Sequence, residues 1–173
     1  MQSSRLSKRA AVGTAVVVGV LIAFAEIVGV AQRGNAVSPV VGVWRVVELT
    51  GPDGKKNTNP QPSVRIFTPR YYSIVEVEAE TPRPELPPTG KRTDKQVADA
   101  FGPFRANAGT YEVKGSEISY KRIAAKEPAV MRAGNTATDT LRVEGKDTLW
   151  LTVKTSQDGP VANPTTFKLT RLE

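Results

Sequence analysis

The stretch Gly42–Val47, GVWRVV, opens the part of the chain that we expect to fold. It is rich in β-branched residues, and residues 51–54, GPDG, follow shortly after it as a strong turn signal. It therefore predicts a first β-strand. Because strand side chains alternate between two faces, Trp44, Val46 and Glu48 are expected to share the inward face.

The rest of the chain repeats this pattern of short β-rich runs between turn residues. Tight hairpins are expected at residues 114–115 and 145–147. Eight strands with short antiparallel connections predict an all-β fold, an eight-stranded antiparallel up-and-down barrel, with a β-sandwich as the alternative. The expected strands are residues 41–50, 63–68, 71–79, 109–113, 117–122, 138–144, 148–155 and 165–172.

The alternation within the strands indicates which side chains line the interior. In residues 71–79 apolar content favours Tyr71, Val75 and Val77 as the inward set, which leaves Glu76 and Glu78 in water. Mostly apolar inward positions suit a small hydrophobic ligand, with a few polar groups near the mouth of the barrel. The candidate ligand-binding residues are Glu48, Tyr71, Val75, Ile118, Tyr120, Arg122 and Leu151.

One helix interrupts the strands. Residues 81–92 hold four prolines and must form a loop, and Thr93 with Gln96 makes a capping box that begins a helix. An apolar face of Val97, Phe101 and Phe104 is expected to pack over one end of a sheet. A second long connection, residues 124–136, is expected to form a lid or an extra turn.

The first 25 residues have the order of a secretory signal peptide. Arg5, Lys8 and Arg9 precede an uncharged run that ends in residues 23–25, AFA, a small-residue cleavage pattern. An uncleaved membrane anchor, residues 10–31, is the alternative. We therefore expect a signal peptide at 1–25, a flexible leader at 26–39 and one barrel domain at 40–173, in an exported, periplasmic or secreted protein.

Composition excludes several kinds of chemistry. The chain has no cysteine and no histidine, so it can form no disulfide, Ser-His-Asp triad or His-ligated zinc or haem. Without the three leader cations, 21 basic residues accompany 17 acidic ones in an interleaved pattern that does not suggest a nucleic-acid partner. No phosphate loop, dinucleotide fingerprint or calcium loop is present, so no cofactor or metal is expected. No feature of the sequence indicates a protein partner. Contact with a membrane is expected only through the N-terminal segment.

The order of several short motifs resembles the bacterial lipocalin-like domain family. These are GVWRVVEL, GPDG, ADAFGPFRANAGTYEV and KDTLWLT, in this order, and the resemblance covers residues 40–173. The resemblance implies that Trp44 lies at the closed end of the barrel with Arg171 packed across its ring. It also implies that Gly42 allows the chain to approach closely at the barrel floor.

Three functions follow as hypotheses. The leading one is an exported lipocalin-like barrel that binds a small hydrophobic or amphipathic ligand, with no catalysis evident. An isomerase- or hydrolase-like enzyme would instead bring Glu48, Tyr120 and Arg122 together at the mouth. A structural or interaction module of the cell envelope would have a barrel filled by its own side chains.

Overall fold

The computed structural model describes residues 38–173. The predicted signal peptide or anchor lies outside the described residues, as does nearly all of the predicted leader. Within residues 38–173 no helix has the length and hydropathy to cross a bilayer.

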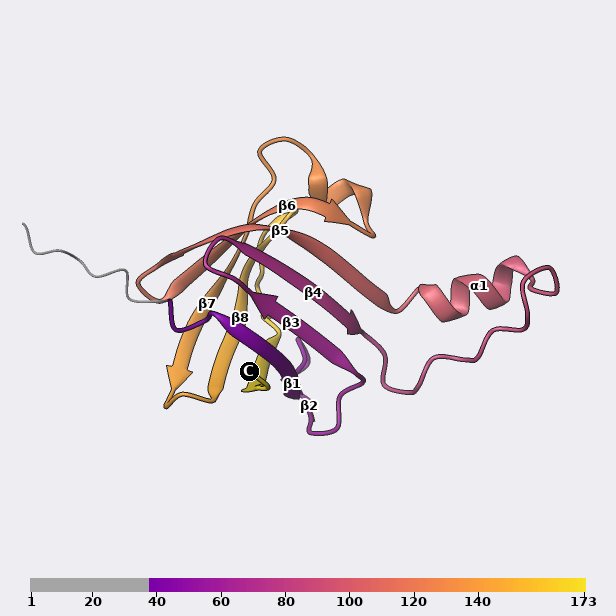
Figure 1. Cartoon of the computed structure of the whole chain (residues 1–173), viewed down its shortest axis with the longest axis horizontal. Helices are drawn as coiled ribbons and strands as arrows, with labels where there is room; N and C mark the ends of the chain where they lie inside the picture. The colour runs from indigo at the N-terminus through magenta and orange to yellow at the C-terminus, as the bar shows by residue number, and fades with distance from the viewer. Residues whose placement is uncertain (1–37) are drawn as a thin grey trace, which may run out of the picture. The chain divides into compact units, whose positions relative to one another are not determined.

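Eight antiparallel strands form one closed barrel (Figure 1). Each strand pairs with its neighbours in the chain, and the last strand pairs with both β8 and β1, which closes the sheet. The predicted up-and-down barrel is therefore confirmed, and the sandwich is excluded. The strands are β1 (Gly42–Thr50), β3 (Ser63–Phe67), β4 (Tyr71–Val77), β5 (Phe104–Lys114), β6 (Glu117–Ala125), β7 (Ala137–Glu144), β8 (Thr148–Ser156) and β10 (Thr166–Arg171), with two-residue strands β2 (Lys56–Asn57) and β9 (Gly159–Pro160) at the edges.

Arg171 closes the barrel floor around Trp44. Its guanidinium lies 4.1 Å from the centre of the fully buried indole ring. It also donates hydrogen bonds to the carbonyls of Val41 (2.7 Å), Pro39 (3.1 Å) and Lys146 (2.7 Å). One side chain thereby joins the last strand to the segment before β1 and to the β7–β8 turn.

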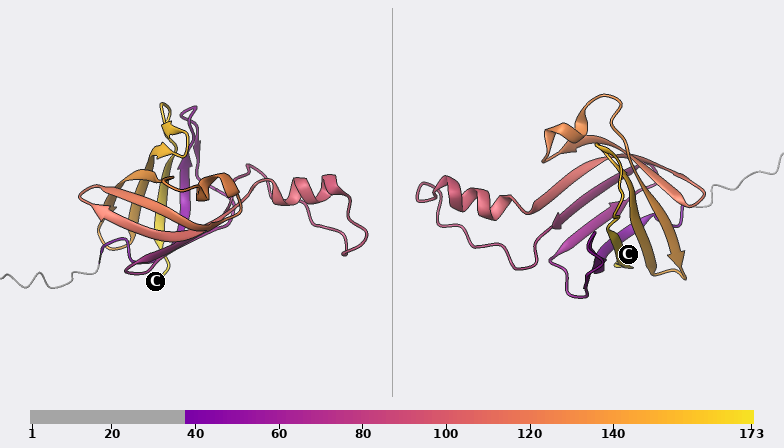
Figure 2. Two further views of the ribbon diagram at one scale, coloured as in Figure 1. Left: turned by 90° about the horizontal axis from the view of Figure 1, so that it is seen from above. Right: turned by 180° about the vertical axis from the view of Figure 1, so that it is seen from behind.

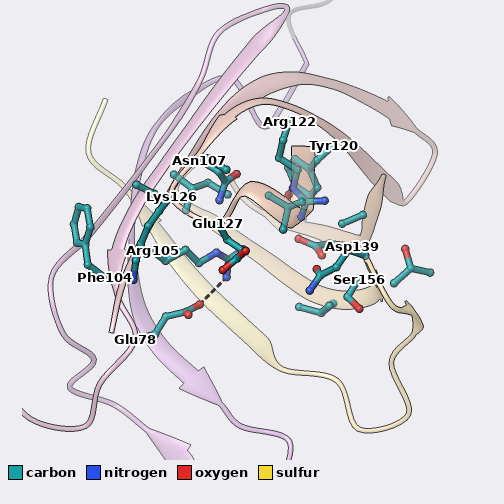
Figure 3. Close-up of a pocket in the computed structure, with 18 of the residues that line it drawn as sticks. Glu78, Phe104, Arg105, Asn107, Tyr120, Arg122, Lys126, Glu127, Asp139 and Ser156 are labelled. Carbon is teal, nitrogen blue, oxygen red and sulfur yellow. Dashed lines mark hydrogen bonds and ion pairs between the residues drawn. The ribbon is translucent and has the colours of Figure 1, made fainter. Parts of the chain in front are cut away.

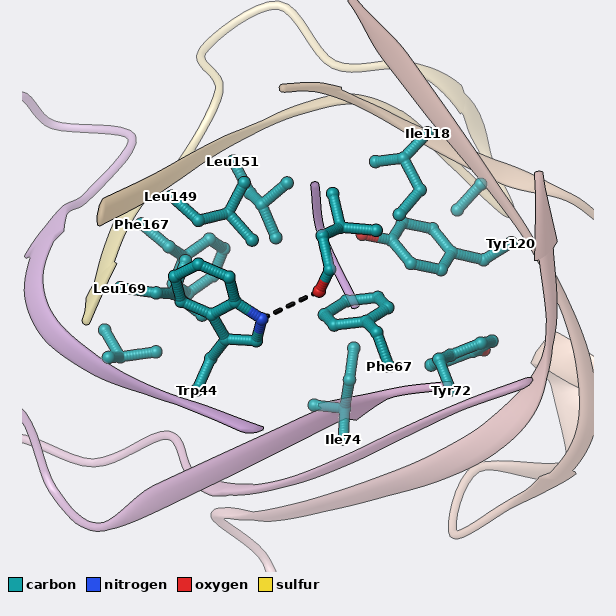
Figure 4. Packing of buried hydrophobic residues seen from close by; sticks show 13 residues of the cluster. Trp44, Phe67, Tyr72, Ile74, Ile118, Tyr120, Leu149, Leu151, Phe167 and Leu169 are labelled. Carbon is teal, nitrogen blue, oxygen red and sulfur yellow. Dashed lines mark hydrogen bonds between the residues drawn. The ribbon is translucent and has the colours of Figure 1, made fainter. Parts of the chain in front are cut away.

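Gly42 makes room for this arginine. Its φ is +144°, and a Cβ at this position would lie 2.1 Å from Arg171 Nη1. The indole Nε1 of Trp44 donates to the Val40 carbonyl at 2.8 Å (Figure 4). Gly42, Trp44 and Arg171 thus lie in contact with one another at this end of the barrel.

The apolar core fills the half of the barrel next to this floor (Figure 4). It draws on alternate residues of nearly every strand, as the period of two requires. Its members include Trp44, Val46, Phe67, Tyr72, Ile74, Ile118, Tyr120, Leu149, Leu151, Phe167 and Leu169, each of them buried.

The inward face predicted for β1 is wrong beyond Val46. A β-bulge inserts Val47 as an extra residue opposite β10, so Glu48 pairs with Lys168 and Leu49 pairs with the buried Phe167. The alternation therefore changes frame, and Leu49 packs against the core. Glu48 turns away from it to form an ion pair with Lys56 of β2 at 3.0 Å.

The inward face predicted for β4 is inverted. Tyr71 is 50% and Val75 41% exposed, whereas Tyr72, Ile74 and Glu76 are buried. The expectation assumed that a glutamate belongs in water because an isolated buried charge is costly. Glu76 is not isolated, since the buried Arg65 of β3 and the partly exposed Arg105 of β5 neutralise it, and so the more bulky set of side chains packs inside.

The helix forms where predicted but does not pack on the sheet. In α1 (Asp94–Phe101), Thr93 accepts from Gln96 N, and the Gln96 side chain accepts from Thr93 N, which confirms the capping box. Val97 and Phe101 remain exposed, and Phe104 belongs to β5. Figures 1 and 2 show the helix and the preceding proline-rich segment as an arm that projects from the barrel.

The connection between β6 and β7 contains the extra turn that was one of its two expected forms. It is the 3₁₀ helix η1 (Pro128–Met131), whose first turn is capped by the Glu127 side chain. The two long connections therefore differ, because one projects outward and the other folds back beside β6.

Replacing Arg171 by alanine should destabilise the protein by about 2–4 kcal/mol, since charged hydrogen bonds to backbone and a cation–π contact are lost together. The matched control is Arg70→Ala, which removes an exposed cation 5.9 Å from the Tyr71 ring and should cost less than about 1 kcal/mol. Urea unfolding of both variants measures the difference. Equal losses would contradict the role of Arg171 in closure.

Candidate functional site

A cavity of about 380 Å³ lies at the end of the barrel opposite Trp44 (Figure 3). Its walls come from the end of β4, the start of β5, the end of β6, the start of β7 and the end of β8. Since adjacent strands are antiparallel, these ends lie together at the mouth. The barrel is thus filled at its floor and hollow at its mouth.

The cavity walls are apolar and polar in comparable measure. Apolar side chains that line it are Ile74, Phe104, Ala106, Ala125, Val130, Ala137 and Val153. The charged and hydrogen-bonding side chains that line it include Glu78, Arg105, Asn107, Tyr120, Arg122, Lys126, Glu127 and Asp139. Such a mixture suits an amphipathic molecule better than a purely apolar one.

A buried ion pair lies in the barrel interior beside the apolar core. Arg65 on β3 is 1% exposed and donates through Nε (3.0 Å) and Nη2 (2.8 Å) to Glu76 Oε2 on β4, which is 4% exposed. Arg105 Nη1 lies 3.0 Å from Glu76 Oε1 and 2.8 Å from Glu78 Oε1. Desolvation alone would raise the pKa of Glu76, but the two arginines outweigh it and hold this pKa below its ordinary value.

For Asp139 on β7, desolvation outweighs the nearby positive charges. Desolvation raises the pKa of its carboxyl, and the opposing charges of Arg65, Arg105 and Arg122 do not fully offset that effect. A buried carboxyl of this kind that lines a cavity is sensitive to pH and to any charged ligand. No sequence signal marks Asp139 as buried, because it stands in a run of alternating polar residues, ATDT.

Three donor groups near the cavity have no hydrogen-bond partner within the described residues. They are the hydroxyls of Tyr72 and Tyr120 and the guanidinium of Arg122, at its Nε and Nη1. The tyrosine rings meet edge to face, with centroids 5.0 Å apart. Tyr120 Oη lies near the Asp139 carboxyl but outside hydrogen-bonding geometry. Buried groups of this kind are costly unless a partner satisfies them.

A bulge in β6 sets the position of Arg122. Gly109 pairs with Arg122 and Ala108 with Ala124, so Ile123 is an extra residue that projects into solvent. The strands approach so closely here that a Cβ on Gly109 would lie 2.0 Å from the Lys121 carbonyl oxygen. The inward series on β6 therefore passes from Arg122 to Ala125, and both residues line the cavity.

The structure brings only some of the predicted ligand-binding residues together. Tyr120 and Arg122 line the cavity, whereas Ile118 and Leu151 lie in the core. Tyr71 and Val75 lie on the outer surface. Glu48 is held by Lys56 and does not line the cavity with Tyr120 and Arg122, so the three residues of the enzyme hypothesis do not meet.

Sequence reasoning missed Arg65, Glu76, Arg105 and Asp139. A usable signal existed for the first two, because strands of a hairpin place opposite charges side by side and Arg65 occupies the middle of an otherwise apolar strand. No such signal marks Asp139. In residues 38–173 no group of three or more acidic side chains is placed to hold a metal ion.

No family model and no curated protein matches the sequence. Among solved structures, the chain is similar to a lipocalin-like protein from Bacteroides uniformis, with 13% identity, a TM-score of 0.45, and coverage of 78% of this chain and 99% of that one. An uncharacterized protein from Bacteroides eggerthii gives 13% identity, a TM-score of 0.44, and coverage of 76% and 98%. A redesigned β-barrel has 17% sequence identity and a TM-score of 0.41, and the match covers 80% of this chain and 96% of that one. The closed eight-stranded barrel is itself consistent with a lipocalin-like domain.

Substituting Glu76 by glutamine should destabilise the protein by about 3–5 kcal/mol, because Arg65 would remain buried without a counter-charge. The control is Glu78→Gln, which removes a half-exposed partner of Arg105 and should cost less than about 1 kcal/mol. Thermal and urea unfolding compare the two variants. A small loss for Glu76→Gln would show that the buried pair does not hold the interior together.

Replacing Asp139 by asparagine should stabilise the protein, in contrast to Glu76→Gln. At neutral pH the variant should be more stable than the parent by about 1 kcal/mol, since a desolvated charge is removed. A carboxyl whose pKa is raised in the folded state binds more protons when folded, so the parent gains stability as pH falls from that raised pKa toward the ordinary value of 3.8. The advantage of the variant should therefore shrink over that range. Unfolding measured at several pH values tests this, and an advantage independent of pH would contradict it.

Proposed function

We propose that this protein binds a small amphipathic molecule in the cavity at the barrel mouth (Figure 3). The observation that carries the proposal is a cavity of about 380 Å³ in a barrel whose other half is densely filled. Ligand pockets in proteins commonly measure about 300–1,000 Å³. The cavity favours ligand binding over the hypothesis of a barrel filled by its own side chains.

The volume limits the size of the ligand. Water occupies about 30 Å³ per molecule in the liquid, and a non-hydrogen atom of an organic molecule needs a similar space, so the cavity suits about a dozen such atoms. A ten-carbon amphiphile is of this size. Its chain would contact the apolar wall formed by Ile74, Ala137 and Val153, and its head group would meet the polar wall.

We further propose that the protein acts outside the cytoplasm, on the strength of the cations, uncharged run and small-residue triplet in its first 25 residues. The test is the mass of the protein purified from the envelope fraction of its own host. A chain that begins at Glu26 supports export with cleavage, whereas a full-length chain in the membrane supports the anchor formed by residues 10–31. A full-length chain in the cytosol would overturn the proposal.

Filling the cavity should abolish binding without unfolding the barrel. Ala125 faces the cavity, so Ala125→Phe should weaken binding of decanoate, 1-decanol and decylamine about tenfold or more by excluding them sterically. Its neighbour Ala124 is exposed on the outer face, and Ala124→Phe is the matched control that should bind as the parent does. Isothermal titration calorimetry below the micellar concentration of each compound makes the measurement. If none of the three binds the parent, or if both variants behave alike, the cavity is not the binding site.

A further inference from the structure

Arg122 is the interior arginine that forms no ion pair with the described residues. Arg65 and Arg105 each lie within ion-pair distance of Glu76, and Arg105 also reaches Glu78. Arg122 forms no ion pair within residues 38–173, and its Nε and Nη1 are sealed from solvent without a hydrogen-bond acceptor. A guanidinium carries five N–H donors and no acceptor, so only an acceptor group can satisfy it.

Two tyrosine hydroxyls lie in the same region and also lack acceptors. Tyr72 and Tyr120 meet edge to face beside Arg122, and both hydroxyls are buried. Desolvation raises the pKa of each, most strongly for Tyr120, which keeps both hydroxyls protonated and able to donate. The inner wall of the cavity therefore holds an excess of hydrogen-bond donors, and these are of the types that bind carboxylates.

We propose that the cavity selects an amphiphile with an anionic head group, a carboxylate, which Arg122 binds with Tyr120 beside it and Tyr72 behind. This inference rests on the proposed ligand-binding function and adds the charge of the ligand and the residue that recognises it. The apolar part of the ligand would extend along Ile74, Ala137 and Val153.

The presence of Asp139 in the same cavity does not favour a cationic ligand equally. A buried carboxyl can escape the cost of desolvation by taking up a proton, and burial raises the pKa of Asp139 in that direction. In addition, three arginines already surround Asp139, whereas Arg122 forms no ion pair within the described residues and lacks a hydrogen-bond acceptor, so Arg122 is the group that still needs an anionic partner.

Calorimetry of the full chain with decanoate and with 1-decanol tests the proposal. The parent should bind decanoate more tightly than 1-decanol. Arg122→Gln should weaken decanoate binding about 10- to 100-fold, the range expected for a charge-assisted hydrogen bond, and should weaken 1-decanol binding far less. The matched control is Lys121→Gln, which removes the same charge from the adjacent, outward-facing position and should leave both affinities unchanged.

A second variant tests the same electrostatics in the opposite direction. Asp139→Asn removes a negative charge from the cavity wall, so it should tighten decanoate binding and change 1-decanol binding far less. This measurement does not depend on the folding of the Arg122 variant. A decanoate affinity that Asp139→Asn leaves the same or weakens would count against a carboxylate at this position.

The outcomes separate this inference from the proposed function. If decanoate and 1-decanol bind the parent equally well, and Arg122→Gln changes neither, the cavity binds amphiphiles without regard to charge, and the inference is overturned while the function stands. Tighter binding of decylamine than of decanoate would likewise overturn it. If no compound binds, the proposed function fails, and the inference fails with it.

Discussion

The contact between Arg171 and Trp44 is the constraint on which the rest of the barrel depends. A meander of antiparallel strands leaves two free edges, and only the pairing of β10 with both β8 and β1 removes them. Arg171 fixes that pairing at its end, because its guanidinium covers the indole ring and binds backbone carbonyls from two other segments. The mouth can remain hollow because the floor is held closed by these contacts and by the core packed on them.

Charge determines how the interior is divided. The Arg65–Glu76 pair lies beside the apolar core, with the Arg65 guanidinium 4.2 Å from the centre of the Phe167 ring. The pair is neutral as a unit and joined by two hydrogen bonds, so it can be buried. Within the described residues Arg122 and Asp139 form no such pair, and they give the cavity its chemical character. Buried polar groups without partners cost stability.

Sequence patterns were sufficient for the order of the strands, the helix cap and the closure, because each depends on residues close together or on a strong signature. They failed for Glu48 and for both faces of β4. The bulge at Val47 leaves no trace in the alternation of apolar residues, so the frame beyond it could not be inferred. Glu76 of β4 can face inward because Arg65 of β3 and Arg105 of β5 pair with it. The alternation of residues within β4 alone does not reveal these partners. Tyr120 and Arg122 were found because β6 alternates regularly up to its bulge.

The bulges in β1 and β6 have a consequence for how such a barrel can change over time. Each one shifts the alternation by one residue between the floor and the mouth, so each strand carries two independent frames of inward positions. Residues that secure the core, such as Val46 and Ile118, belong to the first frame, and cavity-lining residues such as Ala125 belong to the second. Substitutions, or the gain or loss of one residue at a bulge, can then remodel the mouth while the packing of the floor is preserved. The same scaffold can thereby acquire a cavity of new shape and charge without first losing its fold.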